Sequence, residues 1–345
     1  MKKLYVLLAV LLVAAMILPA CAPAQADCKD EKTFCVGLVT DVGKINDKSF
    51  NQSAWEGVQK AEKDLGATVQ YIETADAKDY DKNIATFADE GYDVIVTVGF
   101  GMGEATVKAA GTYPNVKFIG VDQFQSADTA GVVGLNFPED NAGFLVGALA
   151  AMMSKTNHIG AVCGTDAVPP VWRFGEGYKA GAAYADGMKG TTTTVDVVYH
   201  SDVGFDKTFV DPEWGAQTAK SMMDQGADAI FGCGGITGNG AITAAAQAGA
   251  YAIGVDTDQY LTLPEAAPRM LSSAMKLITP GVFDLVSKAK DGSFPVGNYY
   301  GAAGYAPFHD LENEVPADVK ADMEKIAAAL LDGSLKTNVA PVKPQ

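Results

Sequence analysis

The stretch GYDVIVTVGFG, residues 91–101, joins an apolar run to a glycine-rich turn, and GADAIFGCGG, residues 226–235, repeats this pattern. Ile119-Gly-Val-Asp122 is likewise echoed by Ile253-Gly-Val-Asp256. The offsets nearly agree: 135 residues from 91 to 226, and 134 residues from 119 to 253. Two landmarks in register indicate a duplicated lobe rather than a chance match.

Short runs rich in Val and Ile alternate with Ala-rich stretches of helical length from Phe34 onward. Strands that alternate with helices predict βαβ units, mainly parallel sheets and an α/β fold class. Ligands of such sheets bind beyond the carboxyl ends of the strands, where Asp122 and Asp256 stand. The expected strands are 35–40, 68–73, 93–99, 117–122, 158–164, 193–200, 228–234 and 251–256, with helices at 51–65, 142–153, 175–188 and 214–225.

The composition describes a globular, acidic protein. Its 345 residues are enough for two domains, and 48% of them are hydrophobic. The net charge of −16, without a basic cluster after the first residues, argues against a nucleic-acid partner, because phosphate binding needs a cationic surface. An acidic surface also adheres poorly to lipid headgroups, so we expect membrane contact through an anchor.

The amino terminus has the pattern of an export signal. Lys2-Lys3 precedes an apolar run over residues 4–17, and Leu18-Pro19-Ala20-Cys21 follows it. The run is shorter than the about 20 residues that a bilayer span needs. The tetrapeptide resembles the lipobox of bacterial lipoproteins, in which the signal is cut before the Cys and the thiol takes a diacylglycerol.

We therefore expect residues 1–20 to be a signal peptide and residues 21–33 a polar tether. Cys21 is the expected lipid attachment site, which would hold the protein outside the cytoplasmic membrane. The alternative is an ordinary secretory signal in which Cys21 is incidental.

Four cysteines remain if Cys21 carries lipid, and an extracytoplasmic location permits disulfides. Cys28–Cys35 could staple the tether to the first strand, while Cys163 and Cys233 could pair or stay free. Four cysteines allow three full pairings, and the sequence does not choose among them.

Neither a metal site nor a cofactor site is expected. His158, His200 and His309 are scattered, and no Cys-x-x-Cys occurs. The turn at 98–103 departs from the dinucleotide pattern G-x-G-x-x-G because Glu104 stands where the third Gly belongs. Its counterpart at 232–240 lacks the Lys-Ser/Thr ending of a P-loop. No G-x-S-x-G elbow stands out, which argues against hydrolysis.

Polar groups and aromatic rings gather where strands end. The segment 41–52 follows the first strand and surrounds Phe50, and a helix begins near residues 49–51, where Ser or Asn can cap it. Phe209, which precedes a predicted helix start at Asp211-Pro212, is the counterpart of Phe50 in the second lobe. Two rings that face each other across a cleft would sandwich a planar ligand. Asp122 and Asp256 could accept its N–H or hydroxyl groups, and Lys276 could donate. An ordinary polar loop with Phe50 packed in the core is the alternative.

Several motifs together resemble the basic membrane protein family of ABC transporter substrate-binding lipoproteins, which includes purine nucleoside receptors. The resemblance runs from about Cys35 to Leu335. It rests on TDVGKINDKSFNQSAWEG (40–57), NFPEDNAGFLVGALAA (136–151), FVDPEWG (209–215), GGITGNG (234–240), IGVDTDQ (253–259), Lys276 and APFHD (306–310).

The resemblance implies the type I periplasmic binding protein fold, in which three crossovers at a hinge join two doubly wound, parallel-sheet lobes. With the family's usual connectivity, the crossovers are expected near Asn136, Asp256 and Ile278. The first lobe would then contain residues 34–136 and 256–278, and the second lobe residues 137–255 and 279–345.

The resemblance also implies roles for individual residues. Phe50 and Phe209 would stack on a purine, Asp47 and Asp122 would read its edge, and Asp256 and Lys276 would bind the ribose. The expected ligand-binding set is Asp41, Asp47, Phe50, Asn51, Phe100, Asp122, Phe174, Phe209, Gly234, Asp256 and Lys276.

Three departures from the family pattern bear on the base or sugar preference. Val210 stands where the family usually has Asn, Ile236 is an extra residue in its turn, and Gly175 changes the usual Phe-Glu-x-Gly.

The predicted function is that of a monomeric, lipid-anchored receptor without enzymatic activity. It would bind a purine nucleoside, close about its hinge and deliver the ligand to an ABC permease. The alternatives are a receptor of the same fold for a sugar, autoinducer or other polar solute, a nucleoside-cleaving enzyme, and a sensor without a transporter.

Overall fold

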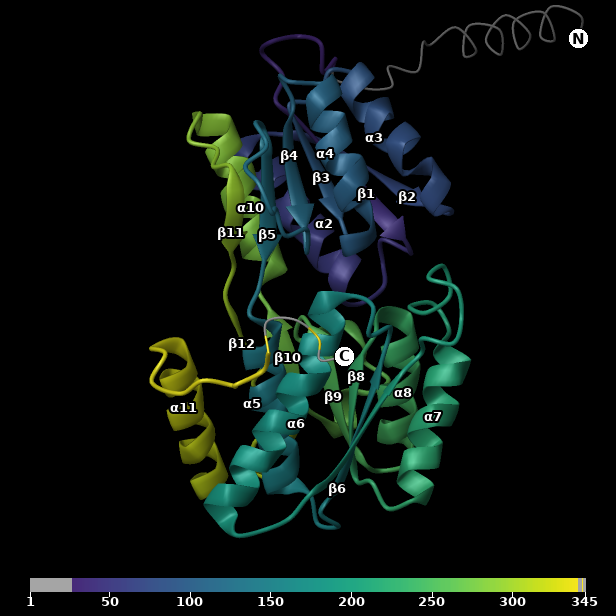
Figure 1. Cartoon of the computed structure of the whole chain (residues 1–345), viewed down its shortest axis with the longest axis vertical. Helices are drawn as coiled ribbons and strands as arrows, with labels where there is room; N and C mark the ends of the chain where they lie inside the picture. The colour runs from purple at the N-terminus through teal and green to yellow at the C-terminus, as the bar shows by residue number, and fades with distance from the viewer. Residues whose placement is uncertain (1–26, 341–342, 344–345) are drawn as a thin grey trace, which may run out of the picture.

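The computed structural model describes residues 27–340 and residue 343. Two six-stranded sheets organise this part of the chain, one in each of two lobes (Figure 1). The predicted signal peptide, Cys21 and most of the tether lie outside the described residues.

The first lobe has the strand order β11-β5-β4-β3-β1-β2. Its strands pair in parallel, and β1, β3 and β4 are almost entirely buried, as expected of a sheet covered by helices on both faces. The strands are β1 (Cys35–Val42), β2 (Thr68–Thr74), β3 (Val94–Val98), β4 (Lys117–Val121), β5 (Val132–Asn136) and β11 (Gly297–Tyr300). The helices are α2 (Phe50–Leu65), α3 (Tyr80–Asp89), α4 (Gly103–Thr112) and α10 (Ile278–Asp291), with short 3₁₀ turns η1 (Ala77–Asp79) and η2 (Phe100–Met102).

The second lobe repeats this plan with the order β12-β10-β9-β8-β6-β7, and β12 joins it antiparallel. Its strands are β6 (His158–Cys163), β7 (Thr194–Tyr199), β8 (Ala229–Cys233), β9 (Tyr251–Asp256), β10 (Met270–Lys276) and β12 (Ala303–Tyr305). Its helices are α5 (Glu139–Met153), α6 (Pro169–Lys189), α7 (Pro212–Asp224), α8 (Gly235–Gln247), α9 (Gln259–Thr262) and α11 (Ala317–Leu331), with 3₁₀ turns η3 (Ala267–Arg269) and η4 (His309–Leu311).

Alternation along each strand divides its side chains between two cores. In the second lobe, Ala161 and Phe231 face a core shared with α5, α6 and α11, whereas Val162 and Ile230 face α7 and α8. The first lobe is built in the same way, with α2 and α10 over one face and α3 and α4 over the other. Helices on both faces leave the ends of the strands as the place for a ligand site.

The lobe boundaries differ from the prediction. The segment 256–278 was expected in the first lobe, but β10 pairs in parallel with β9, so the chain stays in the second sheet beyond Asp256. Two crossovers lie where they were expected, between β5 and α5 near Asn136 and between β10 and α10 near Ile278. The third lies between β11 and β12 rather than at Asp256. Residues 279–300, predicted in the second lobe, belong to the first, as α10 and β11 in the upper lobe of Figure 1 show.

The apolar face of α10 explains this assignment. Ile278, Val282 and Leu285 recur at helical spacing and are fully buried in the first-lobe core beside α2. Gly57 of α2 allows the close approach, because a Cβ there would lie 2.7 Å from the carbonyl oxygen of Thr279.

The cysteine pairing, which the sequence left open, is Cys28–Cys35 and Cys163–Cys233. The first bridge fastens the end of the tether to β1. The second joins register partners on neighbouring strands β6 and β8, beneath the cleft between the lobes.

Glycines bring α5 and α6 into close contact. A Cβ at Gly181 of α6 would lie 1.9 Å from the carbonyl oxygen of Phe144 of α5, and one at Gly147 would lie 2.1 Å from the carbonyl oxygen of Tyr178. Backbone cannot retreat from such a contact as a flexible side chain can, so these positions need glycine.

We expect Gly181→Ala to destabilise the protein by about 1–3 kcal/mol, the usual cost of overpacking. Gly187→Ala is the matched control, since this glycine lies in the same helix and a Cβ there would meet nothing within 4 Å in the described residues. The control should be neutral or stabilising by up to about 1 kcal/mol. Thermal unfolding of both variants tests this, and equal melting temperatures would contradict the packing argument.

Candidate ligand-binding cleft

A cleft between the lobes is lined by all of the residues predicted to bind ligand. It holds about 750 Å³ of empty space, open solvent at its mouth included. The first lobe contributes the ends of β1, β3 and β4 and the start of α2, and the second contributes the ends of β8, β9 and β10. The predicted residues in its lining are Asp41, Asp47, Phe50, Asn51, Phe100, Asp122, Phe174, Phe209, Gly234, Asp256 and Lys276.

Asp41, at the end of β1, packs against Gly99 at the end of β3. Gly99 has φ of 113°, in a region that side-chain-bearing residues rarely adopt, and a Cβ there would lie 2.2 Å from Asp41 Oδ2. The glycine-rich turn therefore makes room for a carboxylate at the cleft.

The carboxylate of Asp47 caps helix α2. It accepts backbone N–H groups of Ser49 (3.0 Å), Asn51 (2.9 Å) and Gln52 (3.1 Å). The sequence suggested Ser or Asn as the capping side chain, but the loop turns Asp47 back over the helix start instead. Because the cap fixes the first turn, it also fixes Phe50, the first residue of α2.

Phe209 of the second lobe lies on the backbone of the β6 end, since a Cβ at Gly164 would come within 2.1 Å of its ring. Phe205 meets the ring of Phe209 edge to face at 5.7 Å. Phe205 also reaches the first lobe, where its ring lies 3.3 Å from a Cβ built at Gly101. Aromatic surface therefore comes into the cleft from both lobes.

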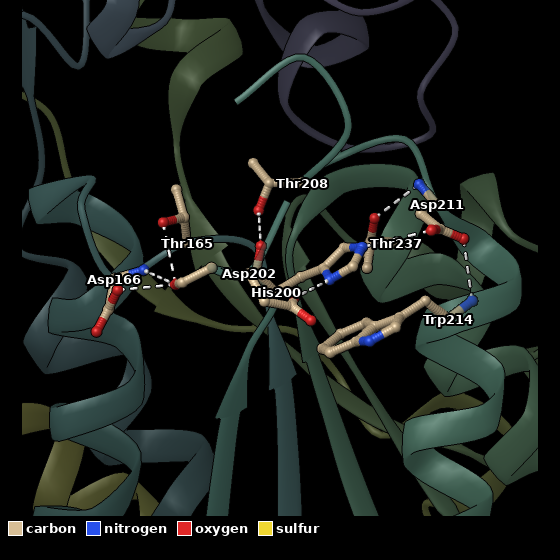
Figure 2. Close-up of polar contacts among 9 residues, drawn as sticks. Thr165, Asp166, His200, Asp202, Thr208, Asp211, Trp214 and Thr237 are labelled. Carbon is tan, nitrogen blue, oxygen red and sulfur yellow. Dashed lines mark hydrogen bonds and ion pairs between the residues drawn. The ribbon is translucent and has the colours of Figure 1, made fainter. Parts of the chain in front are cut away.

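Polar contacts within residues 200–211 and with neighbouring elements hold the loop that carries these rings, and Figure 2 shows these contacts. His200, 2% exposed, stacks on Trp214 at 3.9 Å and faces Asp202 and Asp211 with its two ring nitrogens. Asp211 caps α7 by accepting the N–H of Trp214 at 3.0 Å, and its own N–H binds Thr237 Oγ1 at 2.9 Å. The loop that carries Phe205 and Phe209 is thus tied to both α7 and α8.

Lys276, at the end of β10, is the cationic centre of the cleft. Its Nζ lies 2.5 Å from Asp122 Oδ2 of the first lobe and 3.7 Å from Glu139 Oε1, and it is 4.9 Å from the centre of the Phe50 ring. Burial by itself would lower the pKa of this lysine, but the Asp122, Glu139 and Asp256 carboxylates outweigh burial and raise it. The ammonium therefore stays charged and bridges the two lobes.

Burial raises the pKa values of the carboxylates in this region, and neighbouring carboxylates add to the effect. Desolvation, with the Asp47 and Asp122 carboxylates nearby, raises the pKa of Asp41 to about 8. Desolvation also raises the pKa of Asp47 to about 6, against the three N–H bonds that lower it. Desolvation raises the pKa of buried Glu139 to about 7, although the nearby Lys276 ammonium lowers it. The cleft is therefore unfavourable for a further negative charge.

Two buried oxygens in the lining have no hydrogen-bond partner among residues 27–340 and 343. They are Oδ1 of Asn51 and Oδ1 of Asp122. Buried polar atoms are nearly always paired, so unpaired acceptors at a cleft are positioned to receive donors from a ligand.

Sequence reasoning overlooked several residues of this site. Glu139 and Arg173 join the Lys276 cluster, with Arg173 Nε 3.7 Å from Glu139 Oε2. Phe205 lies four residues before Phe209 in the same loop, and this spacing was an available signal. Val210 and Ile236, at which the chain departs from the family pattern, both line the cleft.

Across the described ranges, no cluster of three or more His, Cys, Asp or Glu side chains is arranged to hold a metal ion. The helices within those ranges include none that is long and apolar enough to cross a membrane.

The chain matches, over residues 34–302, the family described as ABC transporter substrate-binding protein, PnrA-like. It is 32% identical to the CD4+ T-cell-stimulating antigen of Listeria monocytogenes, over 98% of each chain. It is 29% identical to the ABC transporter nucleoside-binding protein BmpA of Lactococcus lactis, over 97% of this chain and 98% of that protein. An uncharacterised lipoprotein of Pyrococcus abyssi is 30% identical over 86% of this chain and 74% of its own length.

A solved structure supports the fold independently. An ABC transporter solute-binding protein from Aeropyrum pernix superposes with a TM-score of 0.78 and 25% identity, over 88% of this chain and 92% of that chain. The expected periplasmic binding protein fold is confirmed.

The raised pKa of Asp41 predicts a pH-dependent stability. The folded state keeps this proton up to about pH 8, whereas an unfolded carboxyl loses it near 3.8. Between these values the folded state binds more protons, so the free energy of unfolding falls as the pH rises through this window. Asp41→Asn removes the titrating group. Its advantage in melting temperature over the wild type should therefore grow between pH 5 and pH 8, by roughly 2–4 °C or more.

Glu62→Gln is the control, since it neutralises an exposed carboxylate of α2. The difference in melting temperature between this variant and the wild type should be the same at pH 5 and at pH 8. An Asp41→Asn difference that is constant with pH would show that Asp41 is ionised throughout the range.

Proposed function

Because the chain belongs to the family of PnrA-like ABC transporter substrate-binding proteins, we propose that it captures a purine nucleoside in the cleft and delivers it to an ABC importer. The observation that carries the choice of ligand is a pair of acceptors, Asn51 Oδ1 and Asp122 Oδ1, that have no partner in the described part of the chain and lie beside aromatic rings from both lobes. The Lactococcus lactis relative, named as nucleoside-binding, supports the same choice.

A purine nucleoside has the chemistry that this lining favours. Its planar base offers a face to Phe50 and Phe209, and its ring and amino N–H groups are donors for the acceptors near α2. The ribose hydroxyls both donate and accept, which suits Asp256 on one side and Lys276 on the other. Residues that pair with such donors reject analogues that lack them, because the buried acceptors then stay unpaired.

The charges favour a nucleoside over a nucleotide. Three carboxyl groups line the cleft and have raised pKa values, those of Asp41, Asp47 and Asp256, so further negative charge is unfavourable there. Lys276 is already paired with Asp122. Lys44, the other lysine of the lining, pairs with Glu73 at 3.0 Å. Within the described part of the chain, a phosphate in this field would therefore find both lysines of the lining already paired. The cleft therefore suits an uncharged ligand.

Closure of the hinge supplies the mechanism. A ligand that touches both lobes binds the closed arrangement more tightly than the open one, and it shifts the equilibrium by this difference in affinity. The permease would then recognise the closed shape. Binding, orientation and release account for the activity without a bond being broken.

Calorimetry on the purified protein tests the ligand class. Adenosine, guanosine or inosine should bind, and the matching monophosphate should bind at least roughly 100-fold more weakly, because a buried phosphate without a partner is strongly unfavourable. Phe209→Ala should lose about 1–3 kcal/mol of binding free energy, the stacking of one base. Phe124→Ala, at a ring 65% exposed on the first lobe, is the control and should bind as the wild type does.

If none of the three nucleosides binds while a sugar or another solute does, the protein is a receptor for another polar ligand and the proposal is wrong. Release of free base during the titration would point to an enzyme instead.

Lipid anchoring through Cys21 is the second part of the proposal, supported by the lipobox-like sequence and by lipoprotein relatives. We expect the wild type to fractionate with membranes and Cys21→Ala to appear in the soluble extracytoplasmic fraction. Metabolic labelling with a fatty acid should mark the wild type alone. Equal labelling of both would place the lipid elsewhere.

A further inference from the structure

The backbone of residues 47–49 in the first lobe is bound by side chains of the second. Asn239 Nδ2 donates to the carbonyl oxygen of Asp47 at 2.8 Å. Gln259 Nε2 and Thr262 Oγ1 both donate to the carbonyl oxygen of Lys48, at 3.2 and 2.7 Å. These three side chains come from α8 and α9, on the second-lobe side of the hinge.

The Ser49 hydroxyl adds a contact in the opposite direction. Its Oγ lies 3.0 Å from the carbonyl oxygen of Val255 and 2.8 Å from Asp256 Oδ2. One hydroxyl proton serves one of these acceptors at a time. The segment 47–49 thus both donates to the second lobe and accepts from it.

The second lobe holds its side of these contacts in place by itself. Gln259 is fully buried, and its Oε1 accepts the backbone N–H of Val255 at 2.9 Å. This bond orients the amide, so that Nε2 points at Asn239 Oδ1 (2.8 Å) and at Lys48 O. Because Asn239 Oδ1 accepts from Gln259, the Asn239 amide nitrogen faces the carbonyl oxygen of Asp47. Both amides are therefore ordered by contacts that persist when the lobes separate.

We propose that Asn239, Gln259 and Thr262 form an inter-lobe latch. They hold the lobes closed by binding the carbonyls of Asp47 and Lys48, in the absence of ligand as well as in its presence. The proposal rests on the hinge closure of the proposed function. It assigns part of the closing free energy to residues outside the cleft lining described above.

The latch is coupled to the ligand site through the residue that both share. The side chain of Asp47 caps α2 and lines the cleft, while its carbonyl binds Asn239. Lys48 has φ of 67°, a left-handed conformation that is uncommon outside glycine and persists where contacts hold it. Phe50 follows two residues later. Closing the latch therefore fixes the segment that presents Asp47 and Phe50.

The three latch residues are positioning residues, since they act through Asp47 and Lys48. Each hydrogen bond is formed with the lobes together and exchanged for water when they part. Losing one bond should shift the equilibrium toward the open form roughly 2- to 12-fold, the usual net contribution of a hydrogen bond. Because the ligand enters the open form, its apparent association rate should rise in proportion to the open population, by up to the same factor where the wild type is mainly closed.

Pulsed electron spin resonance on the ligand-free protein tests the latch directly. The labels are placed at two exposed residues, Lys82 of α3 in the first lobe and Lys220 of α7 in the second. Each is replaced by a genetically encoded keto amino acid that carries the spin label, so the four disulfide-bonded cysteines are not modified. The wild type should show a short-distance closed population. Thr262→Val and Asn239→Ala should each reduce it in favour of a longer distance.

Thr243→Val is the matched control. It removes the same hydroxyl from α8, near Lys48, where Thr243 makes no side-chain hydrogen bond to the first lobe within the described part of the chain. This control should reproduce the wild-type distances. The latch is overturned if Thr262→Val and Asn239→Ala also reproduce them.

With a ligand that binds, stopped-flow measurements should show faster dissociation for both latch variants, roughly 2- to 12-fold. Unchanged dissociation would overturn the latch as well. If no nucleoside binds, the proposed ligand fails, while the distance distributions still decide the latch.

Discussion

The buried ammonium of Lys276 is the interaction on which the arrangement of the lobes depends. It neutralises Asp122 across the cleft and approaches Asp256 and Glu139, the last of which Arg173 also approaches. Its position in the chain matters as much as its charge. Lys276 ends β10 immediately before one crossover, and Glu139 begins α5 immediately after another. The same charge cluster therefore touches the ligand space and two of the three hinge segments.

Two kinds of contact between the lobes have different roles. The charge cluster at Lys276 lies near the hinge and sets the polarity of the ligand space. The contacts of residues 47–49 connect backbone carbonyls to amides that the second lobe has already ordered. The aromatic rings of the cleft are held by the Asp47 cap on one lobe and by the His200–Trp214 stack on the other. A ligand of the right shape completes a closed arrangement that is partly assembled beforehand, which favours tight binding.

The sequence predicted the architecture well where its signals were local. The runs that became β1, β3, β4, β6, β8 and β9 are apolar, bounded by turns and fully or mostly buried, so period and composition sufficed. It missed β5, β10, β11 and β12 as separate strands. Ser272 and Ser273 in β10 are polar yet buried, and β11 reads GNYY, so neither has the Val/Ile composition of a core strand. The lobe boundary was wrong for the same reason, since an unrecognised β10 left the chain free to cross at Asp256.

The sequence by itself determined the duplicated α/β plan, the acidic charge and the residues at the strand ends that share one cleft. Parallel strands end at a common edge, so residue order along each strand was enough to place Asp41 and Asp122 at the ligand edge of one sheet and Asp256 at that of the other. Only the tertiary structure decided which cysteines pair, that Asp47 caps α2, that Glu139 and Arg173 join Lys276, and where the chain crosses between lobes. Apart from the Asp47 cap and the Cys28–Cys35 bridge, these features depend on contacts between segments far apart in the chain, as between Lys276 and Asp122 at a separation of 154 residues. Local patterns of hydrophobicity carry no record of such contacts.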